Sequence, residues 1–281
     1  MRLGIVHPGS MGVTVGMAAA ARGEVLWAGE GRSAATKARA SEAAFTDVGT
    51  LVELATAADA VISLVPPAAA EDCATRLADA GFTGIYVDAN AIAPDRACRL
   101  EEIIEHAGGL FVDGGVIGPP ARQSGTTRLY LSGAEASAVA DLFSGSPLEA
   151  IPLGSQAGTA SALKMAFAAY TKGSGALLIA IRALAEHHHL TEALLAEWGR
   201  SLPDLPDRAD ATLRRSPRKA WRFAGEMAEI ASTFRAAGLP GEFHDAAAVI
   251  FRRIGPERPE EADATDILRL ILADEPPSQA S

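Results

Sequence analysis

One lysine interrupts a helical segment that is otherwise nearly apolar. Lys164 stands within Ser161-Ala162-Leu163-Lys164-Met165-Ala166-Phe167-Ala168-Ala169. Thr171 lies two helical turns further along the chain, on the same face of the expected helix. Loss of solvating water lowers the pKa of a lysine ammonium group, which can then exchange protons near neutral pH. The segment therefore predicts a general acid or base at Lys164, and the alternative is a lysine that follows the helix surface to reach water.

A glycine-containing turn near the start of the chain has the spacing of a phosphate-binding loop. The apolar residues 3–6 predict a short buried strand, His7-Pro8-Gly9-Ser10-Met11-Gly12 predicts a turn, and helical spacing follows. This order places backbone N–H groups and a helix N-terminus against a phosphate. Gly9 and Gly12 take the second and third positions of the dinucleotide pattern G-x-G-x-x-G, and His7 stands at the first. We expect residues 7–12 to contact a dinucleotide.

The residues after the second expected strand bear on which dinucleotide binds. Residues 25–28 predict that strand, and Gly29-Glu30-Gly31-Arg32-Ser33 follows it. In dinucleotide-binding folds this position meets the adenosine ribose, where an acidic residue favours free hydroxyls and an arginine favours a 2′-phosphate. Arg32, Ser33 and Lys37 can surround such a phosphate, whereas Glu30 favours the unphosphorylated ribose. The pattern favours NADP and leaves NAD open.

Alternating strands and helices must position these residues. Beyond the first two strands, short apolar runs predict strands near residues 59–65, 84–88, 110–113 and 128–133, with helices between them. Such an alternation is typical of βαβ units and a mainly parallel sheet, in which ligands bind beyond the carboxyl ends of the strands. The loops that hold Val65 and Pro66, Asn90 and Gly118 therefore converge on one cleft.

The second half of the chain lacks a strand pattern. It consists of expected helices near residues 157–189, 192–201, 206–215, 217–237 and 242–254. We therefore predict an α/β protein, with an N-terminal Rossmann-type doubly wound parallel sheet followed by an all-α C-terminal domain. The predicted domains are residues 1–155, which bind the nucleotide, and the all-helical residues 156–281. Residues 275–281 are rich in proline and serine and are expected to be disordered.

Composition restricts the possible partners. The 281 residues carry a net charge of −10 and are 48% hydrophobic, which disfavours nucleic acid and anionic membranes as partners. Two cysteines, the lack of a bilayer-length apolar run and the lack of a leader-like N-terminus favour a cytoplasmic location. Three consecutive histidines, His187-His188-His189, do not share one helical face, so no metal site is expected. A basic cluster around Pro217 is interpreted as a solvated helix end, with an anion site as the alternative.

Several of these stretches resemble, in the same order, motifs of the β-hydroxyacid dehydrogenase superfamily. Its branches include 6-phosphogluconate dehydrogenase-like proteins, 3-hydroxyisobutyrate dehydrogenase-like NAD(P)-dependent oxidoreductases and imine reductases. The resembling segments are residues 7–12 with G-x-G-x-M-G, 59–66 with D-V-V-I/F-x-x-x-P, 88–91 with D-x-S-T, 111–119 with D-A-P-V-S-G-G, 125–133 with the G-T-L strand, and 158–168 with G-x-x-x-K-x-x-x-N. The last of these places Lys164 on the catalytic lysine of the family.

The resemblance implies a nicotinamide cofactor, hydride transfer to or from a small-molecule substrate, and a homodimer that forms through the helical domain. The proton donor or acceptor of the family falls on Lys164, and Asn90 is implied to act beside it. The residues implied to contact the cofactor beyond the turn are Val65, Pro66 and Asn90, and those implied to contact the substrate are Val116, Ile117, Gly118 and Thr171.

The chain departs from the family motifs at positions that bind a hydroxyacid carboxylate. Ile117 replaces a substrate-binding serine, Pro119 replaces a glycine, and Ala168 replaces the asparagine after the lysine. We therefore expect a less polar substrate, with Asn90 as the remaining polar group. Three hypotheses follow: an NADP-dependent oxidoreductase acting on a carbonyl or hydroxyl carbon, an imine reductase, and a nicotinamide-nucleotide-binding protein without catalysis. Because imine reductases generally replace this lysine, Lys164 favours the first.

Overall fold

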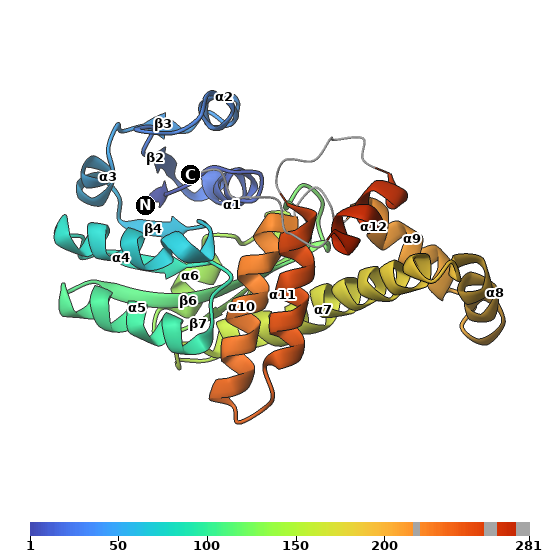
Figure 1. Ribbon diagram of the computed structural model, residues 1–281. Helices are drawn as coiled ribbons and strands as arrows, with labels where there is room; N and C mark the ends of the chain where they lie inside the picture. Colours follow the sequence, from blue (N-terminus) through green and yellow to red (C-terminus); the bar gives the residue numbers. More distant parts are fainter. Residues whose placement is uncertain (216–219, 256–262, 274–281) are drawn as a thin grey trace. The chain divides into compact units, whose positions relative to one another are not determined.

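The chain forms two compact units, Met1–Met165 and Ala166–Ser281 (Figure 1). The computed structural model describes residues 1–215, 220–255 and 263–273, so part of the basic cluster around Pro217 and the tail at 275–281 lie outside the described residues. Helix α7 (Thr159–His187) begins in the first unit and continues in the second. The border between the units falls later than the predicted residue 155, because the first turns of α7 pack on the sheet of the first unit beside Gly115.

An eight-stranded sheet forms the centre of the first unit. Its spatial order is β3-β2-β1-β4-β5-β6-β7-β8, and every neighbouring pair is parallel except β6 with β7. The chain runs outward from β1 to β3 and returns to β4 on the other side of β1, so the sheet is doubly wound. The predicted fold class is confirmed. The strands are β1 (Arg2–Ile5), β2 (Glu24–Trp27), β3 (Thr46–Asp47), β4 (Ala60–Ser63), β5 (Ile85–Asp88), β6 (Leu110–Ile117), β7 (Thr127–Ser132) and β8 (Leu148–Pro152).

Side chains alternate between the two faces of the sheet, and each face has its own core. On adjacent strands, Val61 and Tyr86 belong to one core, whereas Ile62 and Val87 belong to the other. The helices of the first core are α3 (Leu51–Ala57), α4 (Ala70–Asp79) and α5 (Pro94–His106), and those of the second are α1 (Gly12–Ala19), α2 (Ala34–Glu42) and α6 (Ala136–Asp141). Helices on both faces leave the strand ends as the place where a ligand can reach the sheet.

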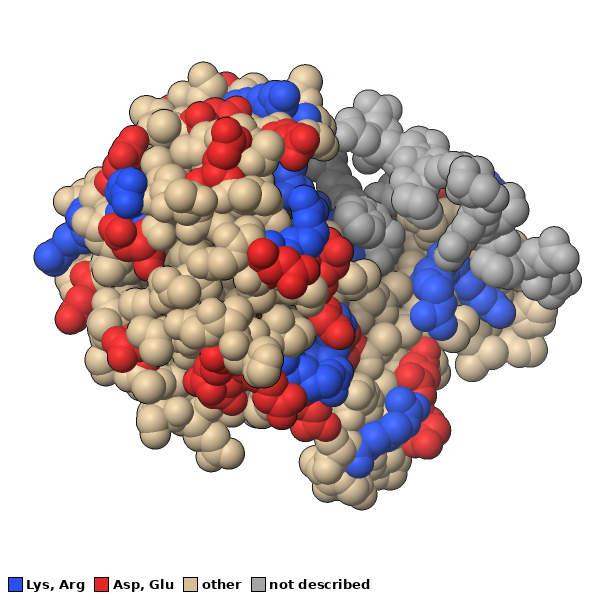
Figure 2. All heavy atoms as spheres, turned by 90° about the vertical axis from the view of Figure 1, so that its left-hand side faces the viewer, with Lys and Arg blue, Asp and Glu red and all other residues tan. Residues whose placement is uncertain are grey.

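Charge is mixed on the face of the protein that Figure 2 shows. On the face shown in Figure 2, lysine and arginine side chains are interspersed with aspartate and glutamate side chains. Such a surface differs from the concentrated basic field that nucleic-acid binding requires.

Helices make up the described part of the second unit. They are the remainder of α7 with α8 (Thr191–Ser201), α9 (Leu205–Arg215), α10 (Ala220–Ala236), α11 (Glu242–Ile254) and α12 (Ala264–Leu272). Figure 1 shows α10 and α11 side by side, and Gly238 turns the chain between them with φ of 72°. The sequence did not predict α12, whose start is marked by reciprocal capping between Asp263 and Asp266. Among the helices that the structure describes, none is both long and apolar enough to cross a membrane.

Candidate functional site

The turn between β1 and α1 has a backbone that only glycine permits at its end. A Cβ atom added to Gly12 would lie 2.2 Å from the carbonyl oxygen of His7, a distance that no side chain tolerates. The N–H group of Gly9 donates to the same oxygen at 2.8 Å, so His7 closes the turn through its backbone. No side chain caps the N-terminus of α1 at Met11, and the first turn of α1 holds no acidic residue. The N–H groups of Val13 and Thr14 donate to the carbonyl oxygens of Gly9 and Met11, each at 3.0 Å, and the helix dipole gives this end a positive potential that favours an anion.

Two arginines reach the glycine turn from the segment after β2. Arg32 donates from Nη2 to the carbonyl oxygen of Val6 at 3.3 Å, and its Nη1 lies 3.5 Å from Nδ1 of His7. The Nε atom of Arg32 is buried and has no hydrogen-bond partner among the described residues. Arg39 donates from Nε to the carbonyl oxygen of Pro8 at 3.3 Å. Arg39 also donates from Nη2 to the hydroxyl of Thr36, three residues earlier on the same helical face, at 3.0 Å. The sequence predicted Arg32 as a site residue but did not single out Arg39.

Ser33 and Lys37 lie at the start of α2. The Ser33 hydroxyl accepts the N–H of Thr36 at 3.3 Å and so caps this helix, while the Lys37 side chain is exposed. The carboxylate of Asp47 accepts N–H groups of Gly29 and Gly49, each at 2.9 Å. Asp47, which sequence reasoning overlooked, thus holds the loop after β2 through its carboxylate.

The structure gives Asn90 a different role from the predicted one. Its side chain is 3% exposed, and its Oδ1 accepts the N–H of Val65 at 2.6 Å. Its Nδ2 donates to Ser63 at 3.1 Å and to Asp88 at 2.6 Å, which uses both amide protons. The expectation that Asn90 serves as a free polar group for the substrate does not fit this geometry. Asn90 instead ties the loop of Val65 and Pro66 to the ends of β4 and β5.

Asp88, the last residue of β5, is completely buried beside Asn90. Burial raises its pKa from 3.8 to about 7, hydrogen bonds from Asn90 oppose this shift, and the nearby charge of Asp113 adds to it. The two carboxylates belong to residues that stand opposite each other in the β5–β6 register. The end of the sheet therefore contains a pair of buried acids, which the sequence analysis did not single out as a site.

Asp113 anchors the start of α7 to β6. Its carboxylate accepts the N–H of Ser161 at 2.9 Å and the hydroxyl of Ser161 at 2.6 Å, and it also accepts the hydroxyl of Ser132 at 3.0 Å. The Ser132 oxygen in turn accepts the N–H of Ala160 at 3.0 Å. Burial raises the pKa of the Asp113 carboxyl, while the contacts with Ser161 lower it. A carboxylate at this helix N-terminus satisfies N–H groups that have no partner within the helix.

Lys164 lies one turn after this anchor. Its Nζ donates to the carbonyl oxygen of Val116 at 2.7 Å, so the amine is held at the end of β6. The close approach requires Gly115, because an added Cβ there would lie 2.8 Å from the oxygen of Ala160 and 3.1 Å from Cβ of Lys164. The Lys164 residue is partly buried.

The side chains of Val116 and Ile117, at the end of β6, are buried. Val116 and Ile117 are 7% and 5% exposed. Gly118 has a φ of 126°, and an added Cβ would lie 2.3 Å from the oxygen of Thr126, so this position also requires glycine. The predicted substrate residue Thr171 is exposed and belongs to the second unit, where it borders a cavity.

Comparison with known proteins reveals the family. A model of the NAD binding domain of 6-phosphogluconate dehydrogenase matches residues 2–144. The chain belongs to this family. The resemblance predicted from the sequence is thereby confirmed. A second model, for a domain of unknown function (DUF1932), matches residues 185–254 of the helical unit.

Individual relatives agree with the family. An uncharacterised 28.5 kDa protein of Methanothermus fervidus is 32% identical over 196 residues, which are 69% of this chain and 75% of that protein. A conserved protein of unknown function, whose structure is described as similar to 3-hydroxyacid dehydrogenases, is 28% identical with a TM-score of 0.63 and covers 96% of this chain and 95% of its own. The 3-hydroxyisobutyrate dehydrogenase of Mycobacterium tuberculosis shares the fold at 15% identity, with a TM-score of 0.70 and coverage of 97% and 99%. A reductive aminase of Aspergillus terreus solved with NADPH shares it at 18% identity, with a TM-score of 0.56 and coverage of 95% and 98%.

The family match covers only part of the site. The glycine turn, Arg32 and Asn90 lie inside the matched NAD-binding domain of the 6-phosphogluconate dehydrogenase family, which supports binding of a nicotinamide cofactor. Lys164 lies between the two matched segments. Neither match therefore assigns a role to Lys164, whose amine lies at the end of β6.

Proposed function

We propose that this protein is an oxidoreductase that prefers NADP and transfers a hydride between the nicotinamide and a small carbonyl or hydroxy substrate, with Lys164 as general acid or base. The observation that carries the proposal is the 2.7 Å hydrogen bond between the Lys164 amine and the carbonyl oxygen of Val116. It holds a proton donor at the carboxyl end of β6, the edge at which ligands bind in doubly wound sheets.

The residues of the turn fit a dinucleotide. The uncapped N-terminus of α1 suits a pyrophosphate, and Gly12 lets the backbone approach it closely. Arg32 has a buried Nε without a partner among the described residues, and its guanidinium suits the 2′-phosphate that distinguishes NADP from NAD. Ser33 and the exposed Lys37 lie nearby in sequence and add hydrogen-bonding groups. When bound, the cofactor supplies or accepts the hydride.

The roles of the remaining residues follow from their contacts. Lys164 gives a proton to the alkoxide that forms as a carbonyl is reduced, or takes the proton of an alcohol in the reverse direction. Asp113 positions Lys164 by holding the N-terminus of α7. Asn90 positions the Val65–Pro66 loop, and the backbone at Val116 to Gly118 borders the substrate.

The substrate is less polar than a hydroxyacid with a free carboxylate. Ile117 is buried and apolar at the position of the family's serine, and both the Oδ1 and the Nδ2 atoms of Asn90 are engaged within the protein. A homodimer through the helical unit is part of the proposal, because exposed apolar side chains gather on α7 and α11. These are Leu177, Leu184, Phe243 and Val249.

The first test measures cofactor binding and turnover together. The purified protein is titrated with NADPH and NADH, and NADPH oxidation is then followed on a panel of aldehydes, ketones and cyclic imines. We expect NADPH to bind more tightly than NADH and at least one carbonyl compound to be reduced. Binding without turnover over the whole panel would support the non-catalytic alternative, and failure to bind either nucleotide would remove the proposal.

Imine reduction is the second candidate function. The buried Ile117 and the engaged Asn90 leave little to bind a carboxylate, as suits an apolar imine. The shared fold with a reductive aminase is compatible with this chemistry. Turnover of cyclic imines without turnover of ketones or hydroxyacids would select this candidate over the first.

A further inference from the structure

The second unit contains a cavity of about 360 Å³, a size that suits a small organic molecule. The polar part of its wall comes from Thr171, Lys172 and Ser174 of α7 and from Arg208 and Thr212 of α9. The apolar part comes mainly from the rings of Phe223 and Phe251. All these residues belong to the second unit. Thr171, which was expected to contact the substrate, is one of them, but the proposed hydride transfer gives it no role.

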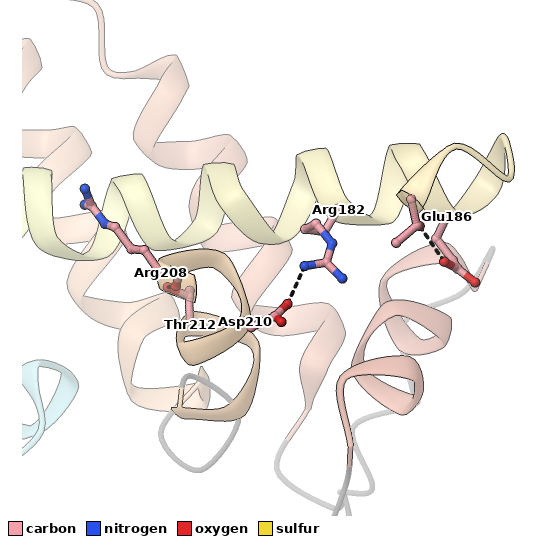
Figure 3. Close-up of polar contacts among 6 residues, drawn as sticks. Arg182, Glu186, Arg208, Asp210 and Thr212 are labelled. Atoms are coloured by element: carbon pink, nitrogen blue, oxygen red, sulfur yellow. Dashed lines mark hydrogen bonds and ion pairs between the residues drawn. The ribbon is translucent and has the colours of Figure 1, made fainter. Parts of the chain in front are cut away.

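Among the described residues that line the cavity, Lys172 is paired with a carboxylate and Arg208 is not. The Nζ of Lys172 lies 2.7 Å from a carboxylate oxygen of Glu226, so this pair is neutral overall. On the neighbouring part of α7, Arg182 is paired with Asp210 at 2.5 Å, and Figure 3 shows the Asp210 side chain directed toward Arg182. The carboxylates of Glu226 and Asp210 are therefore each paired with another cation and not with Arg208.

Arg208 makes hydrogen bonds only to neutral groups in the described part of the chain. Its Nη2 donates to the hydroxyl of Tyr170 at 3.3 Å and to the hydroxyl of Ser174 at 3.2 Å. No described carboxylate lies within ion-pair distance of its guanidinium, which Figure 3 shows projecting away from Asp210. Because Ser174 accepts from Arg208, its own O–H remains oriented to donate elsewhere. A guanidinium and a hydroxyl donor thus stand at the same wall.

These donors select the kind of anion. The planar fork of a guanidinium matches the two oxygens of a carboxylate. One cation without a carboxylate partner among the described residues suits a single negative charge, whereas a phosphate dianion would require further positive charge at the same wall. The hydroxyls of Thr171 and Thr212 already donate to backbone oxygens, of Phe167 and Arg208, and so do not add donors.

The aromatic part of the wall suits an apolar body. The rings of Phe223 and Phe251 meet edge to face with centroids 5.3 Å apart, and Phe251 is 1% exposed. Aromatic walls of this kind pack against hydrocarbon groups with little loss of side-chain entropy. We propose that this cavity binds a small monocarboxylate with an apolar body, with the carboxylate on Arg208 and Ser174 and the body against Phe223 and Phe251.

The test compares acids with neutral molecules of the same shape. Isothermal titration calorimetry is carried out on the full chain with benzoate and hexanoate, and with benzyl alcohol and hexanol as neutral counterparts. We expect at least one of the acids to bind at least tenfold more tightly than its alcohol. Arg208→Gln is expected to weaken acid binding at least tenfold and to remove this preference. Arg200→Gln, which changes an exposed arginine of α8 outside the cavity, is expected to have no effect.

A second variant tests the cavity itself and does not depend on the charge. A Cβ added to Gly175 lies 3.5 Å from Cγ2 of Thr212, an ordinary contact, and leucine favours helices more than glycine does. Gly175→Leu is therefore expected to fold, to fill the cavity and to abolish acid binding, with NADPH affinity unchanged. Absence of acid binding to the wild-type protein, or equal acid binding to the Arg208→Gln and Arg200→Gln variants, would overturn the proposal and leave the proposed oxidoreductase activity untouched.

Discussion

The Nζ atom of Lys164 lies 2.7 Å from the carbonyl oxygen of Val116, and this contact fastens the beginning of α7 to the end of β6. The same helix start is held by the carboxylate of Asp113, which accepts both the N–H and the hydroxyl of Ser161. The amine is thus fixed by two attachments to one strand. Such fixation lowers the entropic cost of placing a proton donor against a reacting group.

Replacement of Lys164 tests its proposed chemistry directly. Lys164→Met keeps most of the side-chain volume but removes the proton donor, so kcat on an identified carbonyl substrate is expected to fall about 10²–10⁴-fold. NADPH affinity is expected to change less than twofold, because the turn and Arg32 hold the cofactor. Steady-state kinetics and fluorescence titration measure the two effects. A Met variant with near-wild-type turnover would show that another group moves the proton.

Asp113→Asn tests positioning at a distance from the reacting groups. Asparagine keeps one oxygen acceptor but cannot accept all the hydrogen bonds from Ser161 and Ser132. We expect a loss of about 1–3 kcal/mol in the free energy of unfolding. We also expect kcat to fall with little change in KM, together with a shift in the pH dependence of kcat. Ser161→Ala, which keeps the backbone bond, is the matched control and should show a smaller effect of the same kind. A purely structural role for Asp113 would lower stability and leave the pH profile in place.

Arg32→Ala tests the choice of cofactor. The loss of a charged hydrogen-bonding group to a 2′-phosphate is expected to weaken NADPH at least tenfold, or about 1.4 kcal/mol, and NADH less than threefold. Arg39→Ala provides the contrast, because Arg39 contacts the backbone of Pro8 and should affect both nucleotides equally. Binding is measured by titration of protein fluorescence. Equal weakening of both nucleotides by Arg32→Ala would remove the 2′-phosphate role.

The glycine turn permits change at one position and not at another. His7 closes the turn through its backbone oxygen, so His7→Gly is expected to retain NADPH binding within about threefold. Gly12→Ala would place a methyl group 2.2 Å from that oxygen and is expected to abolish binding. Calorimetric titration with NADPH measures both variants. If His7→Gly also abolished binding, the imidazole itself would be a required part of the site.

The buried Asp88 makes the stability of the protein depend on pH. Its pKa is about 7 in the folded chain and 3.8 when unperturbed, so the folded chain binds an additional proton between these values. The free energy of unfolding is therefore expected to fall as pH rises from 5 to 8, since the charged carboxylate is costly to bury. Asp113, whose pKa is also raised, acts in the same direction. Urea denaturation at pH 5, 6, 7 and 8 measures the slope, which Asp88→Asn should reduce. An identical slope in this variant would assign the effect to other groups.

The sequence is informative where one local segment determines the geometry. The glycine spacing at residues 7–12 predicted the turn, because the steric limit at Gly12 involves a residue only a few positions away. The alternation of strands and helices predicted the sheet and the edge at which its loops meet. The position of Lys164 opposite β6 followed from the family motif and not from periodicity alone.

Contacts between distant segments were not predictable in the same way. The amide of Asn90 is engaged by Ser63, Asp88 and Val65, and this arrangement depends on the register between β4 and β5. Arg39 reaches Pro8 only because α2 lies beside the turn. The start of α12 has a local signal, because Asp263 and Asp266 stand three residues apart as in a capping box. This signal does not depend on apolar periodicity.

The contact at Gly115 has a consequence for anyone who wishes to change the substrate range of this protein. Ile117 and Pro119 differ from the family pattern and are natural positions for mutagenesis libraries. Position 115 should be left out of such libraries, since even a methyl group there would push against the backbone of α7 and against Lys164, the proposed general acid or base. At this edge of the sheet, positions 117 and 119 are therefore open to substitution, whereas 115 and 118 must remain glycine.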